Sequence, residues 1–373
     1  MVAACGDGGD GTLATSPANS QAVTTTTAAA TTSVAVASST TVTTGTTSTT
    51  QAAGAGEWSR VPADEGVFGG AGDQTMVSVA AGGPGLVASG QDFSGGDGDA
   101  AVWASADGLT WWRVPAGEVV FGGAGDQAMV MVAAVGPGLV GVGYDFSGGD
   151  GEATVWTSPD GVTWSRVPAD AALFGGVGDQ VMVALAAGGP GLVAAGYDSS
   201  GGDRDAAVWV SPDGLVWSRV PADEEVFGGG ADQTIWSVTA GGPGLVAVGD
   251  DVSGGDGDAA VWTSSDGLAW SRVAADAAVF GGAAAQSMQA VAVGGPGLVA
   301  VGFDFTGGDQ DGAVWTSPDG LVWSRVSVEE AALGGTNNQF LRRVVAGGPG
   351  LMVVGADSSG GDRDGAVWYW RSG

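Results

Sequence analysis

The sequence predicts an all-β fold in which six blades, each of four antiparallel strands, form a β-propeller. A repeat of 53 residues is marked by a tryptophan that returns at Trp103, Trp156, Trp209, Trp262, Trp315 and Trp368. Each repeat contains several short apolar segments separated by turn residues, a pattern typical of propeller blades. The two ends of the chain also carry complementary parts of one blade.

The second repeat shows the order of the expected elements. We expect its strands at residues 127–134, 139–144, 153–157 and 163–167. Gly136-Pro137-Gly138 and residues 158–161 form short turns, and residues 145–152 form a longer Gly/Asp loop. We interpret the repeated tryptophans as packing between sheets, and an aromatic cradle for carbohydrate is the alternative.

The chain ends decide whether the ring closes. The last repeat supplies three strands, from residue 339 to about 371. The folded region opens at Trp58-Ser59-Arg60-Val61, which has the pattern of an isolated fourth strand. Pairing of this strand with residues 367–371 would close the ring and leave no free sheet edge. An open superhelical stack is the alternative, although solenoids usually carry distinct capping repeats and this sequence has none.

Composition excludes several functions. The formal net charge is −30, and all 11 basic residues are arginines. This charge argues against nucleic acids and anionic lipid surfaces, and it favours cations or basic partners. The sequence has no histidine and one cysteine, Cys5, so disulfides, cysteine nucleophiles and Cys/His zinc sites are excluded. No apolar run reaches 18 residues, the length that a membrane-spanning helix requires.

The N-terminus resembles a bacterial lipoprotein. Val2-Ala3-Ala4-Cys5 is similar to a lipobox, so we expect residues 1–5 to be a truncated lipobox remnant with Cys5 lipidated. Residues 6–56 are expected to be a disordered Thr/Ala/Ser-rich linker, and residues 57–373 the propeller. The resemblance implies an upstream signal peptide, with Met1 as an internal start, and an extracytoplasmic protein that is lipid-anchored or secreted. A chance cysteine in a disordered leader is the alternative.

A second resemblance lies in the turn after the third strand. The segment from Ser158 to Trp164 resembles the Asp box of sialidases, with one residue fewer between Asp160 and Trp164. Its counterparts begin at Ser105, Ser211, Ser264 and Ser317, and the sixth repeat lacks it. The resemblance implies a hairpin in which Asp and Ser hold the turn while Trp enters the core. In sialidases this box is structural, so the resemblance concerns the fold rather than activity.

Catalytic residues of a sialidase are not recognisable. Such an enzyme requires three converging arginines, a tyrosine nucleophile with a glutamate partner, and an acid. Each repeat instead places one arginine at an equivalent outer position, at Arg60, Arg113, Arg166, Arg219, Arg272 and Arg325. Tyr144, Tyr197 and Tyr369 have no matching glutamate pattern. We therefore expect no catalytic residues, and a glycoside hydrolase stays as the alternative.

An acidic loop between the second and third strands recurs in every repeat. This loop and the link between blades are expected on the same rim. Its candidate metal ligands are Asp92, Asp97, Asp99, Asp198, Asp203, Asp205, Asp251, Asp256, Asp258, Asp304, Asp309, Asp311, Asp357, Asp362 and Asp364. In the second repeat, Glu152 takes the third place after Asp145 and Asp150. Three carboxylates in one loop could surround Ca²⁺. Ordinary turn formation explains the same residues.

The innermost strands supply the remaining candidates for ligand binding. One glutamine opens each of these strands, at Gln74, Gln127, Gln180, Gln233, Gln286 and Gln339. Two interpretations are open. These amides either encircle the mouth of the propeller's central channel or form hydrogen bonds with backbone groups of the loops that join successive blades. Arg342 and Arg343 depart from the repeat in the sixth blade. They either bind an anionic group or pair with neighbouring carboxylates.

Together these patterns predict a non-catalytic, extracytoplasmic binding or scaffold lipoprotein with an acidic, multivalent rim. The expected partners are a protein, a cell-wall or surface polymer, or cations. Contact with a membrane is expected only through a lipid anchor. A sialidase-like or other glycoside hydrolase is the alternative.

Overall fold

The computed structural model describes residues 61–62, 64–115, 117–136, 138–295, 297–327, 333–334, 337–347, 350–359 and 363–371. The chain divides into two units, Met1–Trp58 and Ser59–Gly373, and the described residues belong to the second. The predictions for Cys5, for the linker and for Trp58-Ser59-Arg60 lie outside these residues.

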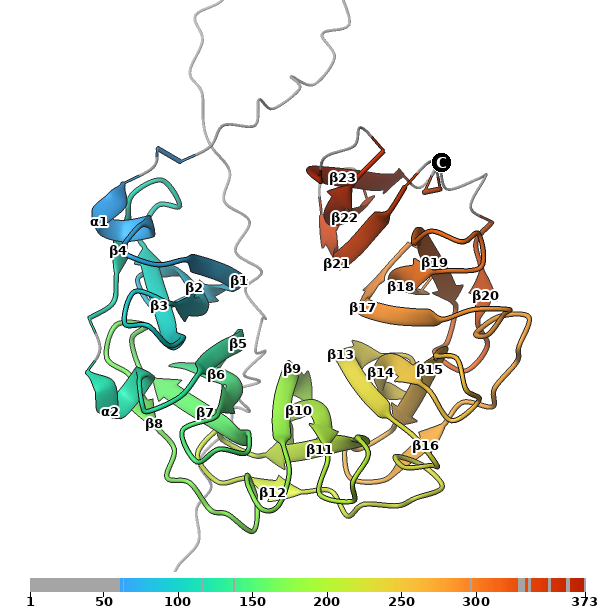
Figure 1. Ribbon diagram of the computed structural model, residues 1–373, viewed down its shortest axis with the longest axis horizontal. Helices are drawn as coiled ribbons and strands as arrows, with labels where there is room; N and C mark the ends of the chain where they lie inside the picture. The colour runs from blue at the N-terminus through green and yellow to red at the C-terminus, as the bar shows by residue number, and fades with distance from the viewer. Residues whose placement is uncertain are drawn as a thin grey trace, which may run out of the picture. The chain divides into compact units, whose positions relative to one another are not determined.

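The described part of the second unit consists of antiparallel sheets that follow one another in chain order (Figure 1). The innermost strands are β1 (Gln74–Gly82), β5 (Gln127–Val135), β9 (Gln180–Gly188), β13 (Gln233–Gly241), β17 (Gln286–Gly294) and β21 (Gln339–Gly347). The second strands are β2 (Gly85–Asp92), β6 (Gly138–Asp145), β10 (Gly191–Asp198), β14 (Gly244–Asp251), β18 (Gly297–Asp304) and β22 (Gly350–Asp357).

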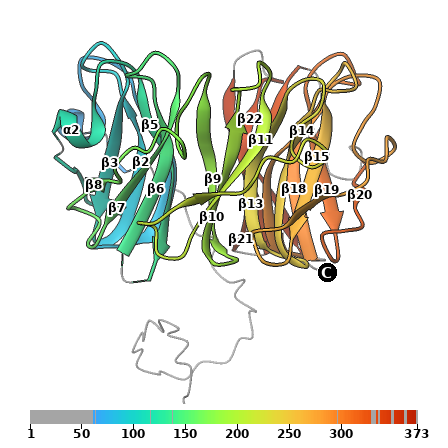
Figure 2. The ribbon, with the colours of Figure 1, turned by 90° about the horizontal axis from the view of Figure 1, so that it is seen from below.

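The outer half of each sheet follows the same order (Figure 2). The third strands are β3 (Asp99–Ser105), β7 (Glu152–Ser158), β11 (Asp205–Ser211), β15 (Asp258–Ser264), β19 (Asp311–Ser317) and β23 (Asp364–Arg371). The fourth strands are β4 (Trp111–Arg113), β8 (Ser165–Arg166), β12 (Ser218–Arg219), β16 (Trp270–Arg272) and β20 (Ser324–Arg325). The described residues therefore form five four-stranded sheets and one three-stranded sheet, β21-β22-β23. The predicted six-bladed propeller is confirmed.

We number the sheets as blades 1 to 6 in chain order. The first three strands of blade 2 match the prediction within one residue at each end. The fourth, Ser165–Arg166, is shorter than the predicted 163–167. The reason is that Thr163 belongs to the preceding turn, where its backbone N–H donates to Asp160 Oδ1 at 2.6 Å. Two short helices, α1 (Glu65–Phe68) and α2 (Glu118–Phe121), were not predicted. Among the described residues, no helix has the length and hydropathy to cross a membrane.

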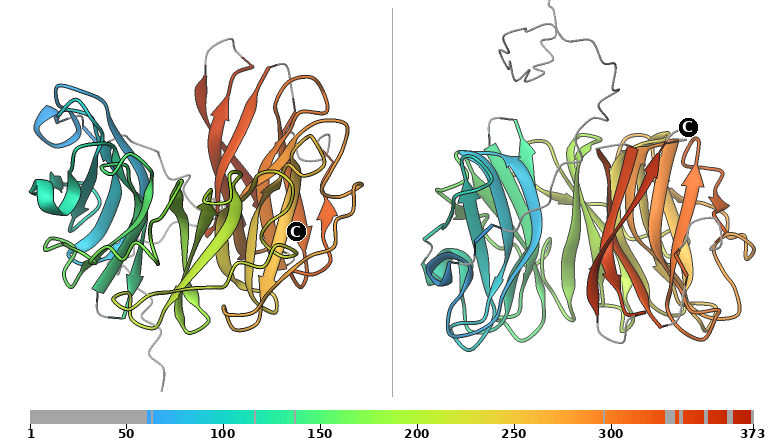
Figure 3. Two further views of the ribbon diagram at one scale, coloured as in Figure 1. Left: turned by 60° about the horizontal axis from the view of Figure 1, so that its bottom comes forward. Right: turned by 90° about the horizontal axis from the view of Figure 1, so that it is seen from above.

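The core lies between neighbouring blades. Blade 2 contributes Val140 and Val142 to one cluster, and blade 3 contributes Met182, Leu192 and Trp209. The tryptophan of the third strand is fully buried in blades 1 to 5. Its indole N–H also has an acceptor, since Trp209 Nε1 donates to the carbonyl oxygen of Leu173 at 2.8 Å. Each blade is thus held by the faces of its neighbours, which stand side by side in Figure 3.

The turn between the third and fourth strands is fixed by its own side chains. In blade 2, the backbone N–H of Gly161 donates to Ser158 Oγ at 2.8 Å. Asp160 Oδ1 accepts the backbone N–H of Val162 at 2.9 Å, and Trp164 Nε1 donates to the carbonyl oxygen of Gly161 at 3.0 Å. These bonds satisfy the polar groups of the turn while the Trp164 ring enters the core.

Candidate functional site

The first aspartate of each acidic loop lies in a compact network of side chains. In blade 2, Asp145 Oδ1 accepts Gln127 Nε2 at 2.9 Å and the backbone N–H of Ser147 at 2.7 Å. Asp145 Oδ2 pairs with Arg166 on the fourth strand. The guanidinium of Arg166 also lies over the Trp156 ring, 5.9 Å from its centre. We call this arrangement the Asp–Arg clamp.

The clamp recurs in the described blades that have a fourth strand. Its ion pairs are Arg113–Asp92, Arg166–Asp145, Arg219–Asp198, Arg272–Asp251 and Arg325–Asp304. Burial alone would raise the pKa of Asp198, but hydrogen bonds from Gln180 and Ser200, together with Arg219, lower that pKa below its usual value. The clamp therefore ties the acidic loop to the outer strand and holds the first aspartate ionised.

In this arrangement the first aspartate of each loop, which is one of the predicted calcium ligands, is engaged by groups of the protein itself. The first carboxylate accepts hydrogen bonds through both oxygens and is neutralised by arginine in blades 1 to 5. The second and third aspartates lie farther along the loop and at the start of the third strand. Among the described residues, no three acidic side chains gather as metal ligands would. The predicted ligand Asp362 lies outside the described residues.

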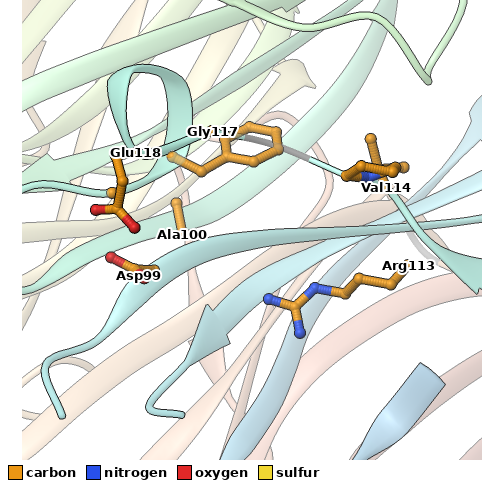
Figure 4. Close-up of a pocket in the computed structure, with 9 residues that line it drawn as sticks. Asp99, Ala100, Arg113, Val114, Gly117 and Glu118 are labelled. Carbon is orange, nitrogen blue, oxygen red and sulfur yellow. The ribbon is translucent and has the colours of Figure 1, made fainter. Parts of the chain in front are cut away.

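The third aspartate lies instead beside an acid from the link between blades. Asp99 and Glu118 line one end of a pocket of about 240 Å³, and Figure 4 shows their carboxyl groups turned toward each other. Burial raises the pKa of Asp99, and the charge of Glu118 raises it further. In blade 3, burial together with Glu224 and Asp203 raises the pKa of Asp205 to about 6. These acid pairs concentrate negative charge on one rim.

We expect Asp205→Asn to stabilise the protein at pH 8 and to leave its stability unchanged at pH 4. The folded-state pKa of Asp205 is raised, so ionisation disfavours the folded state increasingly as the pH rises from about 4 through 6. Removing the charge should add on the order of 1 kcal/mol to the free energy of unfolding at pH 8, after allowance for solvent screening.

Urea unfolding at pH 4, 6 and 8 measures this effect. Glu225→Gln is the matched control, because Glu225 is an exposed acid in the same link. An equal gain from both variants, or a gain that does not depend on pH, would contradict a specific repulsion at Asp205.

The predicted ring of glutamines lies inside the blades. Gln127, Gln180, Gln233, Gln286 and Gln339 are at most 3% exposed, and Gln74 is half-buried. Each Nε2 donates to the first aspartate of its own loop, as Gln233 does to Asp251 at 2.9 Å. The glutamines are therefore part of the clamp, and the buried ones do not offer their amides at the mouth of the channel.

The innermost strands carry unlike residues at their bulges. Each strand has a bulge at one equivalent position, occupied by Val77, Val130, Val183, Trp236, Gln289 and Arg342. Arg342 and Arg363 both lie against the Phe340 ring, at 5.5 and 4.0 Å from its centre. Burial lowers the pKa of Arg343, with a smaller effect from Arg342. Neither Arg342 nor Arg343 forms an ion pair with a described carboxylate.

Sequence reasoning missed a half-buried acid, Asp250, on the second strand of blade 4. Trp236 Nε1 donates to Asp250 Oδ1 at 2.6 Å. Burial raises the pKa of Asp250 to about 6, even though the hydrogen bond from Trp236 opposes this shift. Arg204, whose guanidinium lies 4.7 Å from the centre of the Tyr197 ring, also acts on Asp250 electrostatically. The sequence does contain a signal for Asp250, because an acid at this position departs from the repeat. The equivalent residues of the other blades are Gln91, Tyr144, Tyr197, Phe303 and Ala356.

No protein-family model matches the sequence, and no curated protein matches it. Solved structures similar to the chain include YjhT, at 11% identity, with 79% of this chain and 93% of that chain covered and a TM-score of 0.43. A putative glycoside hydrolase from Parabacteroides distasonis is 12% identical, with coverages of 79% and 87% and a TM-score of 0.38.

A family 117 glycoside hydrolase from the marine bacterium Zobellia galactanivorans is 14% identical to the chain. The alignment covers 48% of this chain and 55% of that enzyme, with a TM-score of 0.33, so the chain spans about half of the enzyme's length. These likenesses concern the propeller fold, and we take no site residues from them.

Proposed function

We propose that the protein is a non-catalytic binding or scaffold module that presents an acidic, multivalent rim to a basic partner outside the cell. The observation that carries this proposal is the distribution of arginine. The clamp arginines neutralise the first aspartate of each loop, whereas Asp97, Asp203 and Asp256 form no ion pair among the described residues. Negative charge is thereby repeated around one rim.

Repetition of the acidic loop allows the rim to bind a partner through several contacts at once. Each acidic loop offers only a weak contact with a lysine or arginine in water, worth well under about 1 kcal/mol. Several contacts on one partner act together, because the second contact forms at a high effective concentration once the first is made. The partner that suits this rim is an extended basic protein segment or a cationic surface polymer.

We expect a fluorescent 20-residue lysine peptide to bind the full-length protein and to dissociate as salt is added. Asp203→Asn combined with Asp205→Asn should weaken binding about three- to tenfold, and the same change in blade 4 should add to the loss. Fluorescence anisotropy at 20 and 200 mM salt provides the measurement.

Asp213→Asn combined with Asp266→Asn is the matched control for charge, because it also removes two carboxylates and Asp266 holds the equivalent turn of blade 4. Asp213 lies in the turn between the third and fourth strands, where an asparagine Oδ1 can still accept the backbone N–H groups of Leu215 and Val216. Equal weakening by this control would show that net charge alone drives binding. Absence of binding by the wild-type protein at low salt would overturn the proposed function.

A glycoside hydrolase is the second candidate, and Asp250 is the observation that favours it. A half-buried carboxylic acid with a pKa of about 6 suits a general acid near neutral pH. Asp232 is a neighbouring carboxylate that could take the second role in hydrolysis. Turnover of a fluorogenic glycoside panel by the wild-type protein, lost in Asp250→Asn, would favour this candidate over the binding module.

The extracytoplasmic location of the proposed module rests on the N-terminal sequence. The resemblance of Val2-Ala3-Ala4-Cys5 to a lipobox supports a lipid anchor, and the Thr/Ala/Ser-rich linker supports a solvated tether. The resemblance of the Ser158–Trp164 turn to an Asp box supports kinship with sialidase-like propellers, without implying their activity. Mass spectrometry of the native protein tests the anchor, and an unmodified Cys5 would contradict it.

A further inference from the structure

The described turns between the third and fourth strands each expose one apolar side chain at the same position. These residues are Leu109, Val162, Leu215, Leu268 and Leu321. The aspartate of the turn binds this position only through its backbone, as Asp319 Oδ1 accepts the backbone N–H of Leu321 at 2.9 Å. A polar residue would serve the turn equally well, so turn formation does not explain the apolar side chains.

These turns lie on one rim together with the hairpins between the first and second strands, and we call it the hairpin rim. Because neighbouring strands are antiparallel, the hairpin rim lies at the opposite ends of the strands from the acidic loops. Here a hairpin of blade 4 meets a turn of blade 5. A Cβ atom built on Gly242 would lie 2.6 Å from the carbonyl oxygen of Asp319, and one built on Gly320 would lie 3.2 Å from Pro243 Cδ. The hairpin and the turn therefore form one continuous surface.

An apolar hollow of about 480 Å³ lies on this surface, between blades 4 and 5, and its lining includes Pro243, Val293, Leu298, Pro318 and Leu321. Val293 is 47% exposed and Leu321 is 52% exposed. Val293 departs from the repeat, because the equivalent residues are Ala81, Ala134, Ala187, Ala240 and Ala346. Valine in place of alanine adds exposed apolar surface at this one interface between blades.

The charge of the hairpin rim indicates what would fill the hollow. Asp319 also lines it, and the backbone N–H groups of Val322 and Leu321 lower the pKa of Asp319, so its carboxylate is ionised at neutral pH. The other described turns carry an aspartate at the same position, namely Asp107, Asp160, Asp213 and Asp266. None of these turns contains a basic residue, over residues 105–110, 158–163, 211–216, 264–269 and 317–322.

This charge selects among the possible occupants of the hollow. A second copy that packed by the same rim would bring like charges together, and an anionic lipid surface would be repelled. A partner that offers apolar side chains next to lysine or arginine matches both the hollow and the aspartates.

We propose that the hollow between blades 4 and 5 binds an extended segment of a partner protein in which apolar side chains are flanked by lysine or arginine. An apolar side chain of the partner enters between Val293 and Leu321, and a neighbouring basic side chain pairs with Asp319. This site lies on the opposite rim from the acidic loops, so it goes beyond the proposed function, and each site can be tested without the other. Two partners could then be held at once, one on each rim.

Fluorescence anisotropy with two peptides tests the site in the full-length protein. Leucine and lysine alternate in the first peptide, and serine replaces leucine in the second. Both peptides should bind at low salt through their charge. Only the leucine peptide should stay bound at about 200 mM salt, because salt screens charges and leaves apolar contacts intact. Val293→Ala combined with Leu321→Ser should weaken that binding about tenfold.

Leu215→Ser is the matched control, because Leu215 is the exposed residue of the equivalent turn in blade 3, where the counterpart of Val293 is Ala187. This control should change the binding of the leucine peptide by less than about twofold. Val293 and Leu321 are both exposed, so the double variant should keep the Tm of the wild type.

Four results would overturn the proposal. The leucine peptide could fail to bind the wild type at the higher salt concentration, or could bind the double variant equally well. An equal loss in Leu215→Ser would mean that the whole rim adheres to apolar peptides. A dimer in sedimentation that the double variant disperses would mean that a second copy covers the hollow. Binding to phosphatidylcholine vesicles that the double variant loses would mean that lipid covers it.

Discussion

Trp209→Ala is expected to lower the free energy of unfolding by about 4 kcal/mol, the largest effect that we predict for a single substitution. The Trp209 side chain is fully buried between blades 2 and 3. Its removal leaves a large cavity, deprives the carbonyl oxygen of Leu173 of its indole donor, and removes the ring beneath Arg219. Chemical denaturation followed by circular dichroism at pH 7 provides the measurement.

Two variants separate burial from hydrogen bonding at this position. Trp209→Phe keeps most of the apolar volume and loses the indole N–H, so we expect a loss of about 1 to 2 kcal/mol. Leu215→Ala in the neighbouring turn is the surface control, because Leu215 is 60% exposed, and it should change stability by less than about 0.5 kcal/mol. A loss in Trp209→Ala no larger than that in Leu215→Ala would contradict the interpretation of the repeated tryptophans as core.

Arg219→Ala is expected to lower the free energy of unfolding by about 2 to 3 kcal/mol at pH 7. The substitution leaves the Asp198 carboxylate without its counter-ion, and the Asp198 side chain is only 9% exposed. The estimate is below the range for fully buried pairs because the Arg219 side chain is 24% exposed and solvent screens part of the interaction.

The loss should depend on pH in a defined direction. The folded-state pKa of Asp198 lies below its usual value, so the clamp stabilises the protein above about pH 4 and loses this contribution as the pH falls further. The difference between wild type and Arg219→Ala should therefore shrink in acid. Arg204→Ala is the control in the same blade, because Arg204 is exposed and lies outside the clamp. Equal losses in the two variants would contradict a special role for the clamp.

The clamp illustrates a limit of sequence reasoning. The repeat places an arginine on every fourth strand and an aspartate at the end of every second strand, and both positions could be predicted. Their contact could not, because Asp145 and Arg166 are 21 residues apart and meet only through the registers of β6 on β7 and of β7 on β8. The aspartates were therefore considered as metal ligands, although their oxygens are engaged by arginine, glutamine and backbone N–H groups.

The glutamines are a second case in which the sequence predicted the position of a residue but not the contacts of its side chain. Their position at the start of each innermost strand was correctly predicted. Side-chain direction at the end of a strand depends on the loop that covers it, and here Gln127 turns inward to reach Asp145 and Ser147. Asp250 was missed for a related reason, since its raised pKa arises from burial in the folded protein rather than from its local sequence.

The sequence by itself determined the period of the blades, the order of their strands and the tryptophans that fill the core. These properties follow from local rules, because alternation and turn residues define strands, and a fixed repeat multiplies one blade. Only the tertiary structure decided which charges are neutralised and which stay on the rim. The reason is that electrostatic partners are chosen by distance and burial, and both are set by the packing of strands far apart in the chain.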